Sequence, residues 1–214
     1  MTIIFDFGGV LVKLDKQRCI DAFEKLGFNL TPFIGTYAQA GILSRIERGE
    51  AEISEFCEEI RKVSGLPLKD SDICEAWASF LTEVPHERIE MLRRIKKNYP
   101  LCVLSNTNEI HWGLAENKYF VQPGERIEDL FTHVFLSYKM GVEKPEKEIF
   151  ERVISTLKEP ADSLLFLDDS EENCKAARKS GLRSLIAPAD GSWMSYFDEE
   201  GKLKPEFEAK SMEV

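Results

Sequence analysis

Residues 2–11, with the sequence TIIFDFGGVL, constrain the fold more than any other stretch of the chain. The apolar run over residues 3–5 is typical of a strand that is covered on both faces, and such strands belong to parallel sheets. The run ends at Asp6, after which Gly8 and Gly9 allow the backbone to bend sharply. Open α/β sheets bind ligands beyond the carboxyl ends of their strands, so we expect Asp6 at a binding site. An aspartate in this position can also simply close a strand in a turn.

The rest of the chain divides into a helical stretch and a stretch in which strands and helices alternate. Residues 14–84 show helical periodicity and no strand pattern, whereas the alternation after residue 85 is typical of parallel βαβ units. We therefore predict an α/β fold with a core of residues 1–13 and 85–214 and an all-helical insert of residues 14–84. The predicted elements are strands over residues 101–104, 133–136, 163–167 and 182–187, helices over residues 15–26, 31–49, 54–64, 70–81, 85–97, 145–157 and 171–179, and a mobile tail from about residue 205.

The composition excludes several classes of partner. Of the 214 residues, 43% are hydrophobic and 31% charged, which is ordinary for a globular protein. The formal net charge of −10 disfavours nucleic acid and anionic membrane surfaces, and no apolar run is long enough to span a bilayer. The five cysteines are scattered and follow no secretory signal, so we expect reduced thiols in a cytoplasm. The sequence leaves the oligomeric state open.

Polar side chains also follow two later predicted strands. A lysine lies in a loop just before a predicted helix. Ser105-Asn106 follow the strand over residues 101–104, Asp168-Asp169 follow the strand over residues 163–167, and Lys144 precedes a helix. Taken singly, these residues can be turn residues, helix caps or an exposed lysine. Because the carboxyl ends of parallel strands meet at one edge of the sheet, together they favour a single site.

This combination of groups fits phosphoryl transfer. We expect Asp6 to attack phosphorus and form an aspartyl-phosphate, with the negative charge offset by Mg²⁺. The predicted metal ligands are Asp6, the backbone carbonyl of Gly8 and Asp169, while Asp168 orients a metal-bound water. Lys144 is predicted to neutralise a phosphate oxygen directly.

The remaining phosphate oxygens and the rest of the substrate need further contacts. The Ser105 hydroxyl and the backbone N–H of Asn106 are predicted donors to the phosphate. For substrate choice we favour Asn108, because it follows the predicted phosphate-binding serine closely. Weaker candidates, each of which can also lie on a solvated face, are Arg45, Arg48, Glu50, Glu109 and His111.

The chain resembles the haloacid dehalogenase-like (HAD) superfamily of Mg²⁺-dependent phosphohydrolases. The resemblance covers nearly the whole length and is carried by four motifs, at residues 6–10 (DFGGV), 104–106 (LSN), 144–145 (KP) and 168–173 (DDSEEN). It implies a Rossmann-like three-layer core, and the helical insert looks like the family's α-helical (C1) cap, which closes over the site.

Within the superfamily, the chain is most similar to bacterial α-glucose-1-phosphate phosphatases. This similarity rests on residues 104–108 (LSNTN), residues 141–146 (GVEKPE) and, in the cap, residues 47–50 (ERGE). The implied substrate is a small phosphorylated metabolite, with a sugar phosphate favoured.

One position departs from the pattern of most family phosphatases. They carry a second aspartate two residues after the nucleophile, which protonates the leaving alcohol, and here that position is Gly8. Sugar phosphatases that resemble this chain also carry glycine there, and we expect a water, placed by Asp15 or by the substrate, to act instead. Gly8 argues against a phosphomutase, and the acidic pair Asp168-Asp169 argues against a metal-independent dehalogenase. A non-catalytic binding module of the same fold is the alternative from a different class, although a pure binder has no need of Asp6.

Overall fold

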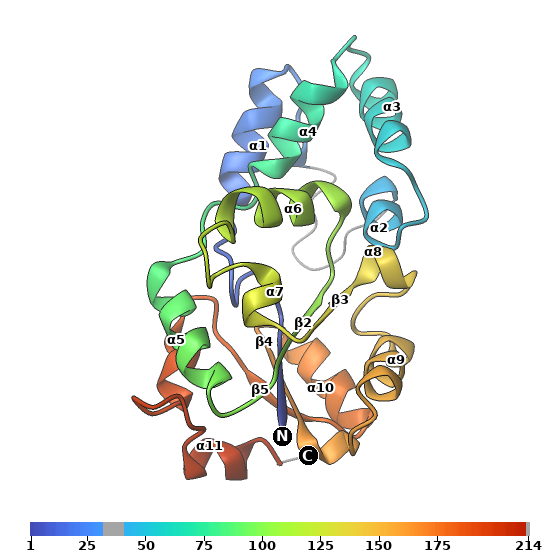
Figure 1. Ribbon diagram of the computed structural model, residues 1–214. Coiled ribbons are helices and arrows are strands. Elements are labelled where there is room, and N and C mark those ends of the chain that lie inside the picture. The colour runs from blue at the N-terminus through green and yellow to red at the C-terminus, as the bar shows by residue number, and fades with distance from the viewer. Residues whose placement is uncertain (32–40, 213–214) are drawn as a thin grey trace.

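A parallel five-stranded sheet with the order β3-β2-β1-β4-β5 forms the centre of the structure, a computed structural model that describes residues 1–31 and 41–212 (Figure 1). The first strand of the chain is the central one, because β1 pairs with both β2 and β4. The strands are β1 (Thr2–Phe5), β2 (Leu101–Ser105), β3 (His133–Leu136), β4 (Leu164–Asp168) and β5 (Arg183–Ile186).

The register of the three middle strands brings their polar ends together. Phe5 is opposite Val103 in β2 and Leu167 in β4, so Asp6 and Asp168 come one residue later, and Ser105 two residues later, at the same edge of the sheet. The backbone N–H of Asp6 continues this pairing by donating to the carbonyl of Leu167 over 2.8 Å. The predicted convergence of polar strand ends is therefore built into the pairing itself.

Helices cover both faces of the sheet, since successive strand residues point to opposite sides. One apolar cluster joins Ile3 and Phe5 to α5 and to the segment around Trp193, and the other joins Ile4 to α9 and α10. The core helices are α5 (His86–Lys96), α6 (Glu109–Leu114), α7 (Ile127–Leu130), α8 (Ser137–Met140), α9 (Lys147–Leu157), α10 (Glu171–Lys179) and α11 (Pro205–Lys210).

Four helices lie together beyond the carboxyl ends of the strands, at the end of the molecule opposite the N-terminus (Figure 1). Their apolar side chains form a third cluster, separate from the two in the core. We propose on this basis that residues 14–84 are a cap domain and that residues 1–13 and 85–214 are the core. The helices are α1 (Lys16–Lys25), α2 (Ile42–Glu47), α3 (Ile53–Ser64) and α4 (Asp70–Ala78).

The two connections between this cap and the core run side by side. The N–H of Lys13 donates to the carbonyl of Glu83 and the N–H of Asp15 to that of Phe80, each over 2.8 Å. An antiparallel bridge between Leu14 and Leu81 lies within this ladder. The chain thus enters and leaves the cap at one place.

The observed elements differ from the predicted ones in two places, and one further predicted helix begins outside the described residues. Most of the start of the helix predicted from Thr31 falls in residues 32–40, which lie outside the described residues. The tail predicted to be mobile from Pro205 instead forms α11, with Phe207 stacked on Tyr196 at a centroid distance of 4.3 Å. The helices α6, α7 and α8 span four to six residues each, too short to show helical periodicity.

The structure also bears on two expectations drawn from composition. All five cysteines are free thiols, as reduced thiols would be, while a cytoplasmic location stays a prediction. Among the described residues, no helix combines the length and the apolar character that crossing a membrane requires.

Candidate active site

The ammonium group of Lys144 is the centre of the site. Its Nζ lies 2.6 Å from Asp6 Oδ1 and 2.7 Å from Asp168 Oδ2, and it donates a third hydrogen bond to the carbonyl of Leu104 over 3.0 Å. The side chain is 2% exposed, so both ion pairs are shielded from water. An ammonium has three N–H donors, and all three are bonded to protein acceptors here. The predicted direct contact with a phosphate oxygen therefore requires Lys144 to exchange one of these partners.

Asn106 fixes the backbone of Lys144 from the next loop. Its Nδ2 donates to the Lys144 carbonyl, and its Oδ1 accepts from the Lys144 N–H, both over 2.8 Å. We predicted a role for the backbone N–H of Asn106 but none for this side chain. No signal in the sequence links the two residues, because they are 38 positions apart.

The two aspartates at the end of β4 make different contacts. Asp168 Oδ1 accepts from the N–H of Ser170 over 2.8 Å and from Asn173 Nδ2 over 3.1 Å, so this carboxylate is held by the start of α10. Asp169 is exposed and packs against Gly9. Gly9 has φ of 79°, and a Cβ there would collide with Asp169 Oδ2, so glycine is required on both counts.

The three carboxylates can hold a divalent cation. One oxygen each from Asp6, Asp168 and Asp169 lies within 4.8 Å of the others. Hard oxygen donors of this kind are the ligands that Mg²⁺ prefers, and Gly8, whose carbonyl we predicted as a ligand, lines the adjacent cavity. The residues present therefore fit Mg²⁺.

The electrostatics show the same need for positive charge. Burial raises the pKa of Asp6. The attraction of Lys144 lowers it only in part, because the negative charges of Asp168 and Asp169 raise it further. Burial, with the neighbouring Asp168, also raises the pKa of Asp169. For Lys144 burial acts to lower the pKa, but the carboxylates of Asp168 and Asp6 outweigh it and the pKa is raised. Without a second cation, the site thus holds more negative charge than Lys144 can offset.

A buried arginine supports the loop that follows Asp6. Arg88, from α5, is 1% exposed and donates to the carbonyls of Gly9 over 2.7 Å, Val10 over 2.9 Å and Ala189 over 2.6 Å. It ties this loop to the one that follows β5. The sequence contains no motif that marks Arg88, and we did not predict its role.

A cavity of about 440 Å³ opens beside these groups, between core and cap. Its volume is at the small end for ligand sites, which suits a small metabolite. Ser105, Asn106 and Lys144, our candidates for binding the phosphate, line the end that belongs to the core. The lining also contains Glu47 from α2, Glu143, Glu172, His111 and an apolar set made of Phe7, Val12, Leu14, Phe80 and Leu81.

Asn108 lies elsewhere than its predicted role requires. Its side chain is 2% exposed and its Oδ1 accepts from the N–H of His111 over 3.1 Å, which caps the start of α6. It is not among the described residues that line the cavity. The preferred substrate-binding candidate is thus a helix cap in this structure, and the neighbouring His111 contributes to the cavity instead.

Gly8 stands where most family phosphatases carry an aspartate, and Leu14 is its nearest side chain. A Cβ on Gly8 would lie 3.3 Å from Leu14 Cδ1, so an apolar side chain lies directly against this position. Asp15, our candidate for placing a water, is exposed, and its Oδ1 accepts from the N–H of Arg18 over 2.9 Å as the cap of α1.

The cap is joined to the loop that carries Lys144 by an ion-pair cluster. Arg48, just after α2, has Nε 3.3 Å from Glu143 Oε1, and its Nη2 pairs with Glu146. Ser44 Oγ also donates to Glu143 Oε1 over 3.4 Å. Next to Arg48, Gly49 approaches α8 so closely that a Cβ would collide with the carbonyl of Tyr138.

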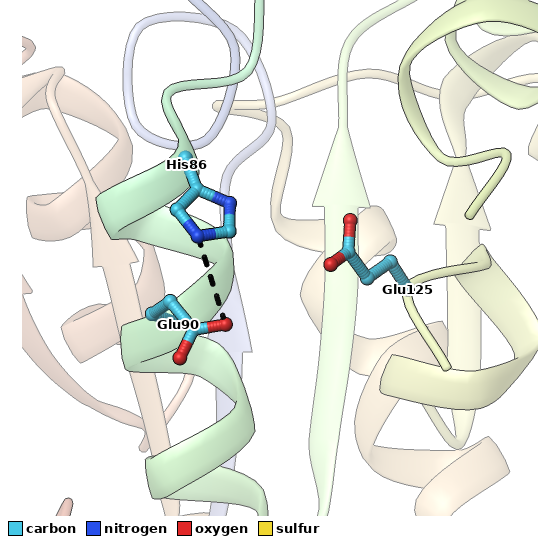
Figure 2. Close-up of side chains that lie close together, drawn as sticks. All are labelled: His86, Glu90 and Glu125. Atoms are coloured by element: carbon cyan, nitrogen blue, oxygen red, sulfur yellow. Dashed lines mark ion pairs between the residues drawn. The ribbon is translucent and has the colours of Figure 1, made fainter. Parts of the chain in front are cut away.

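A second group of metal-type donors lies on the core surface. Figure 2 shows His86 and Glu90 one turn apart on α5, with Glu125 facing them. Arg93 already pairs with Glu90 over 2.7 Å and with Glu125 over 3.0 Å, while His86 Nε2 is 4.0 Å from Glu90. Because one guanidinium is ion-paired with both carboxylates, we assign this group to a surface salt-bridge network.

The fold, the motifs and the site define a haloacid dehalogenase-like hydrolase. The family model of that description matches residues 1–181, so the chain belongs to this family, and the predicted α/β core is confirmed.

The chain is also similar over most of its length to individual members of this family. The chain is 30% identical over 192 residues to a D-ribitol-5-phosphate phosphatase of Bacteroides thetaiotaomicron, covering 89% of this chain and 93% of that protein. A crystal structure of a HAD family enzyme from the same species, in complex with magnesium and inorganic phosphate, matches with a TM-score of 0.87 and 35% identity over 92% of this chain and 98% of the other. A HAD-like hydrolase from Porphyromonas gingivalis matches with a TM-score of 0.82 and 27% identity over 91% of this chain and 94% of that one.

Proposed function

We propose that the chain hydrolyses the phosphate monoester of a small sugar or sugar alcohol, through an aspartyl-phosphate formed on Asp6. That it is a phosphatase with Mg²⁺ as cofactor agrees with its family, its curated relative and the magnesium and phosphate bound in its structural neighbour. The relative's substrate, D-ribitol 5-phosphate, makes a polyhydroxylated ester the first candidate.

The observation that carries the proposal is the Asp6–Lys144–Asp168 arrangement at the edge of the sheet. A carboxylate that attacks a phosphate must overcome like-charge repulsion, and an adjacent ammonium lowers that cost. The backbone pairing of Asp6 with β4 holds the nucleophile on a rigid strand end. Ser105 and the N–H of Asn106 are the proposed donors to the phosphate oxygens.

Mg²⁺ held by Asp6, Asp169 and the Gly8 carbonyl would supply the further positive charge that a phosphate dianion needs in this site. Asp168, at the end of β4, would orient a water bound to the ion, because Asn173 and the N–H of Ser170 hold its carboxylate in place.

Gly8 provides no carboxyl group to protonate the leaving oxygen. Loss of a positioned acid and base costs about 10²–10⁴ in rate, and a good leaving group reduces this cost. Because position 8 offers no acidic side chain and Leu14 lies against it, we propose that the proton reaches the leaving oxygen from water or from a substrate hydroxyl.

The test compares the wild type with Asp6→Asn and with a surface control, Asp162→Asn. The substrates are p-nitrophenyl phosphate and D-ribitol 5-phosphate, with Mg²⁺ present, removed by EDTA and restored. Asp6→Asn is expected to lower kcat by at least about 10³-fold with an unchanged circular dichroism spectrum, because the nucleophile is gone. Asp162→Asn should behave as the wild type. Hydrolysis that persists in Asp6→Asn, or in EDTA, would contradict the proposal.

A further inference from the structure

The loop between β1 and the cap is folded tightly on itself. The N–H groups of Leu11 and Val12 both donate to the carbonyl of Phe7 over 2.9 Å. The N–H of Gly9 donates back to the Val12 carbonyl over the same distance of 2.9 Å. The carbonyls of Gly9 and Val10 take no part in these bonds, so inside the protein they need donors from another segment.

Arg88 of α5 is the main donor to these two carbonyls. Its Nη1 donates to the Gly9 carbonyl over 2.7 Å and to the Val10 carbonyl over 2.9 Å. The indole Nε1 of Trp193 also donates to Val10, over 3.1 Å. Arg88 Nη2 reaches the carbonyl of Ala189, in the loop after β5, over 2.6 Å. One side chain therefore holds two loops that lie far apart in the sequence.

The charge of Arg88 is balanced by these carbonyls and not by an acid. Among the residues that the structure describes, no carboxylate forms an ion pair with it. The side chain is 1% exposed, and burial lowers its pKa, although an arginine stays protonated in proteins. A buried cation is costly when its partners are lost, and a guanidinium is planar and rigid. The three carbonyls are therefore held firmly in the positions that Arg88 defines.

The two loops held by Arg88 surround part of the proposed metal site. The Gly8 carbonyl, a proposed Mg²⁺ ligand, shares its peptide group with the nitrogen of Gly9. No described residue donates a hydrogen bond to this carbonyl, and Gly8 lines the cavity. A Cβ on Gly9 would collide with Asp169 Oδ2 and lie 3.5 Å from Ala189 Cβ, so both loops meet beside the Asp169 carboxylate. A shift of the backbone at Gly9 would thus move one proposed ligand and the surroundings of another.

We propose that Arg88 is a positioning residue that sets the affinity of the site for Mg²⁺, by holding the Gly8 carbonyl and the surroundings of Asp169 in the arrangement that the ion requires. The proposal rests on the Mg²⁺-dependent phosphatase function proposed for the same site. Mg²⁺ demands near-ideal octahedral geometry, so small displacements of its ligands weaken binding. Arg88 is not among the described residues that line the cavity, and it acts through the backbone instead of touching the substrate.

The test measures Mg²⁺ binding by isothermal titration calorimetry in the absence of substrate. Arg88→Met removes every donor, whereas Arg88→Lys keeps the charge and loses the planar fork. The Kd for Mg²⁺ is expected to rise about 10–100-fold in Arg88→Met and by about threefold or more in Arg88→Lys. The Mg²⁺ concentration that half-saturates hydrolysis should rise in parallel. Arg94→Met, exposed on the same helix, is the matched control and should bind Mg²⁺ as the wild type does.

A purely structural role for Arg88 predicts a different result. It would lower the temperature of unfolding and leave the Kd for Mg²⁺ unchanged in the folded variants, which would overturn the proposal while leaving the phosphatase function intact. Circular dichroism reports folding, and Arg88→Lys decides the question where Arg88→Met does not fold.

The wild type provides a second measurement that does not depend on any variant. Because Arg88 joins the two loops, Mg²⁺ should slow amide hydrogen exchange at residues 189–191 as well as at residues 8–11. Protection that is confined to residues 8–11 would count against Arg88 as the link. A wild type that binds no Mg²⁺ would overturn the proposed metal site, and this inference with it.

Discussion

His111 lies where the cap meets the core, and its hydrogen bonds define its protonation state. Its Nε2 is 3.0 Å from the carbonyl of Trp77 in α4, and its Nδ1 is 3.3 Å from Asn108 Nδ2. A carbonyl only accepts, so Nε2 must carry the proton, and Nδ1 then accepts from the amide of Asn108. The ring also stacks on Trp77 and Phe80, with centroid distances of 5.0 and 5.9 Å. The neutral ring is therefore built into the contact between the two parts.

This residue predicts a pH dependence of stability. Burial lowers the pKa of His111 from its ordinary 6.5 to about 4, so between these values the unfolded chain binds the proton and the folded chain does not. Stability from this group is complete above about pH 6.5 and is lost as the pH falls towards 4, by about 2 kcal/mol at pH 5. Urea unfolding at pH 5 and pH 8 should show this loss in the wild type and a smaller one in His111→Gln.

The control for this comparison is His86→Gln, because His86 is an exposed histidine on α5. It should lose as much stability at pH 5 as the wild type does. Equal losses in the wild type and in His111→Gln would show that the ring is protonated in the folded protein.

At the scale of elements, the loops after β2 and β3 are joined by side chain to backbone bonds. Asn106 bonds both backbone groups of Lys144, and the hydroxyl of Ser137 accepts from the N–H of Thr107 over 2.9 Å and donates to its carbonyl over 3.1 Å. The position of the Lys144 ammonium thus depends on a neighbouring loop as well as on its own.

Asn106→Ala is expected to weaken both stability and catalysis. It leaves the N–H and carbonyl of Lys144 without their partner, which costs about 1–3 kcal/mol for each buried group that stays unsatisfied. A displaced ammonium should also lower kcat by about tenfold or more, since small misplacements of catalytic groups are costly. Steady-state kinetics and thermal unfolding measure the two effects. Asn117→Ala removes a bond of similar length, 2.7 Å to the Gly113 carbonyl, from an exposed part of the chain and should change neither.

The sequence predicted the elements that carry strong local patterns. The strands before Asp6 and up to Asp168 come from continuous apolar runs, and the helix predicted over residues 15–26 is α1. The cross-links between loops were not predictable, because Asn106 and Lys144 meet only through the pairing of β2 with β3. Asn108 illustrates the opposite error, since closeness in sequence to the site suggested a ligand where the fold needs a helix cap.

At the scale of the whole molecule, two arginines of the cap differ in their partners: one pairs within the cap and the other with the core. Arg45, in α2, pairs with Glu55 inside the cap at 3.3 Å. Arg48, three residues later, pairs with Glu143 and Glu146 in the core. Both arginines are partly exposed, so each ion pair contributes modestly and is weakened by salt.

Arg48→Ala is therefore expected to raise KM for a neutral sugar phosphate about threefold to fivefold, because a less firmly seated cap contributes less to binding. The change in kcat should stay within about threefold, since Lys144 keeps its contacts with Asp6 and Asp168. Arg45→Ala should match the wild type in both constants. A fall in kcat with unchanged KM in Arg48→Ala would instead assign Arg48 to the chemical step.

The ladder between Lys13–Asp15 and Phe80–Glu83 has a consequence for how such a molecule can diversify. The two connecting segments are hydrogen-bonded to each other where they leave the core. The pairing of the sheet therefore does not depend on how many residues are inserted between them. A different module can be grafted there while every β-strand keeps its neighbours. The core, which carries the proposed catalytic residues, can thus stay the same while the inserted cap changes.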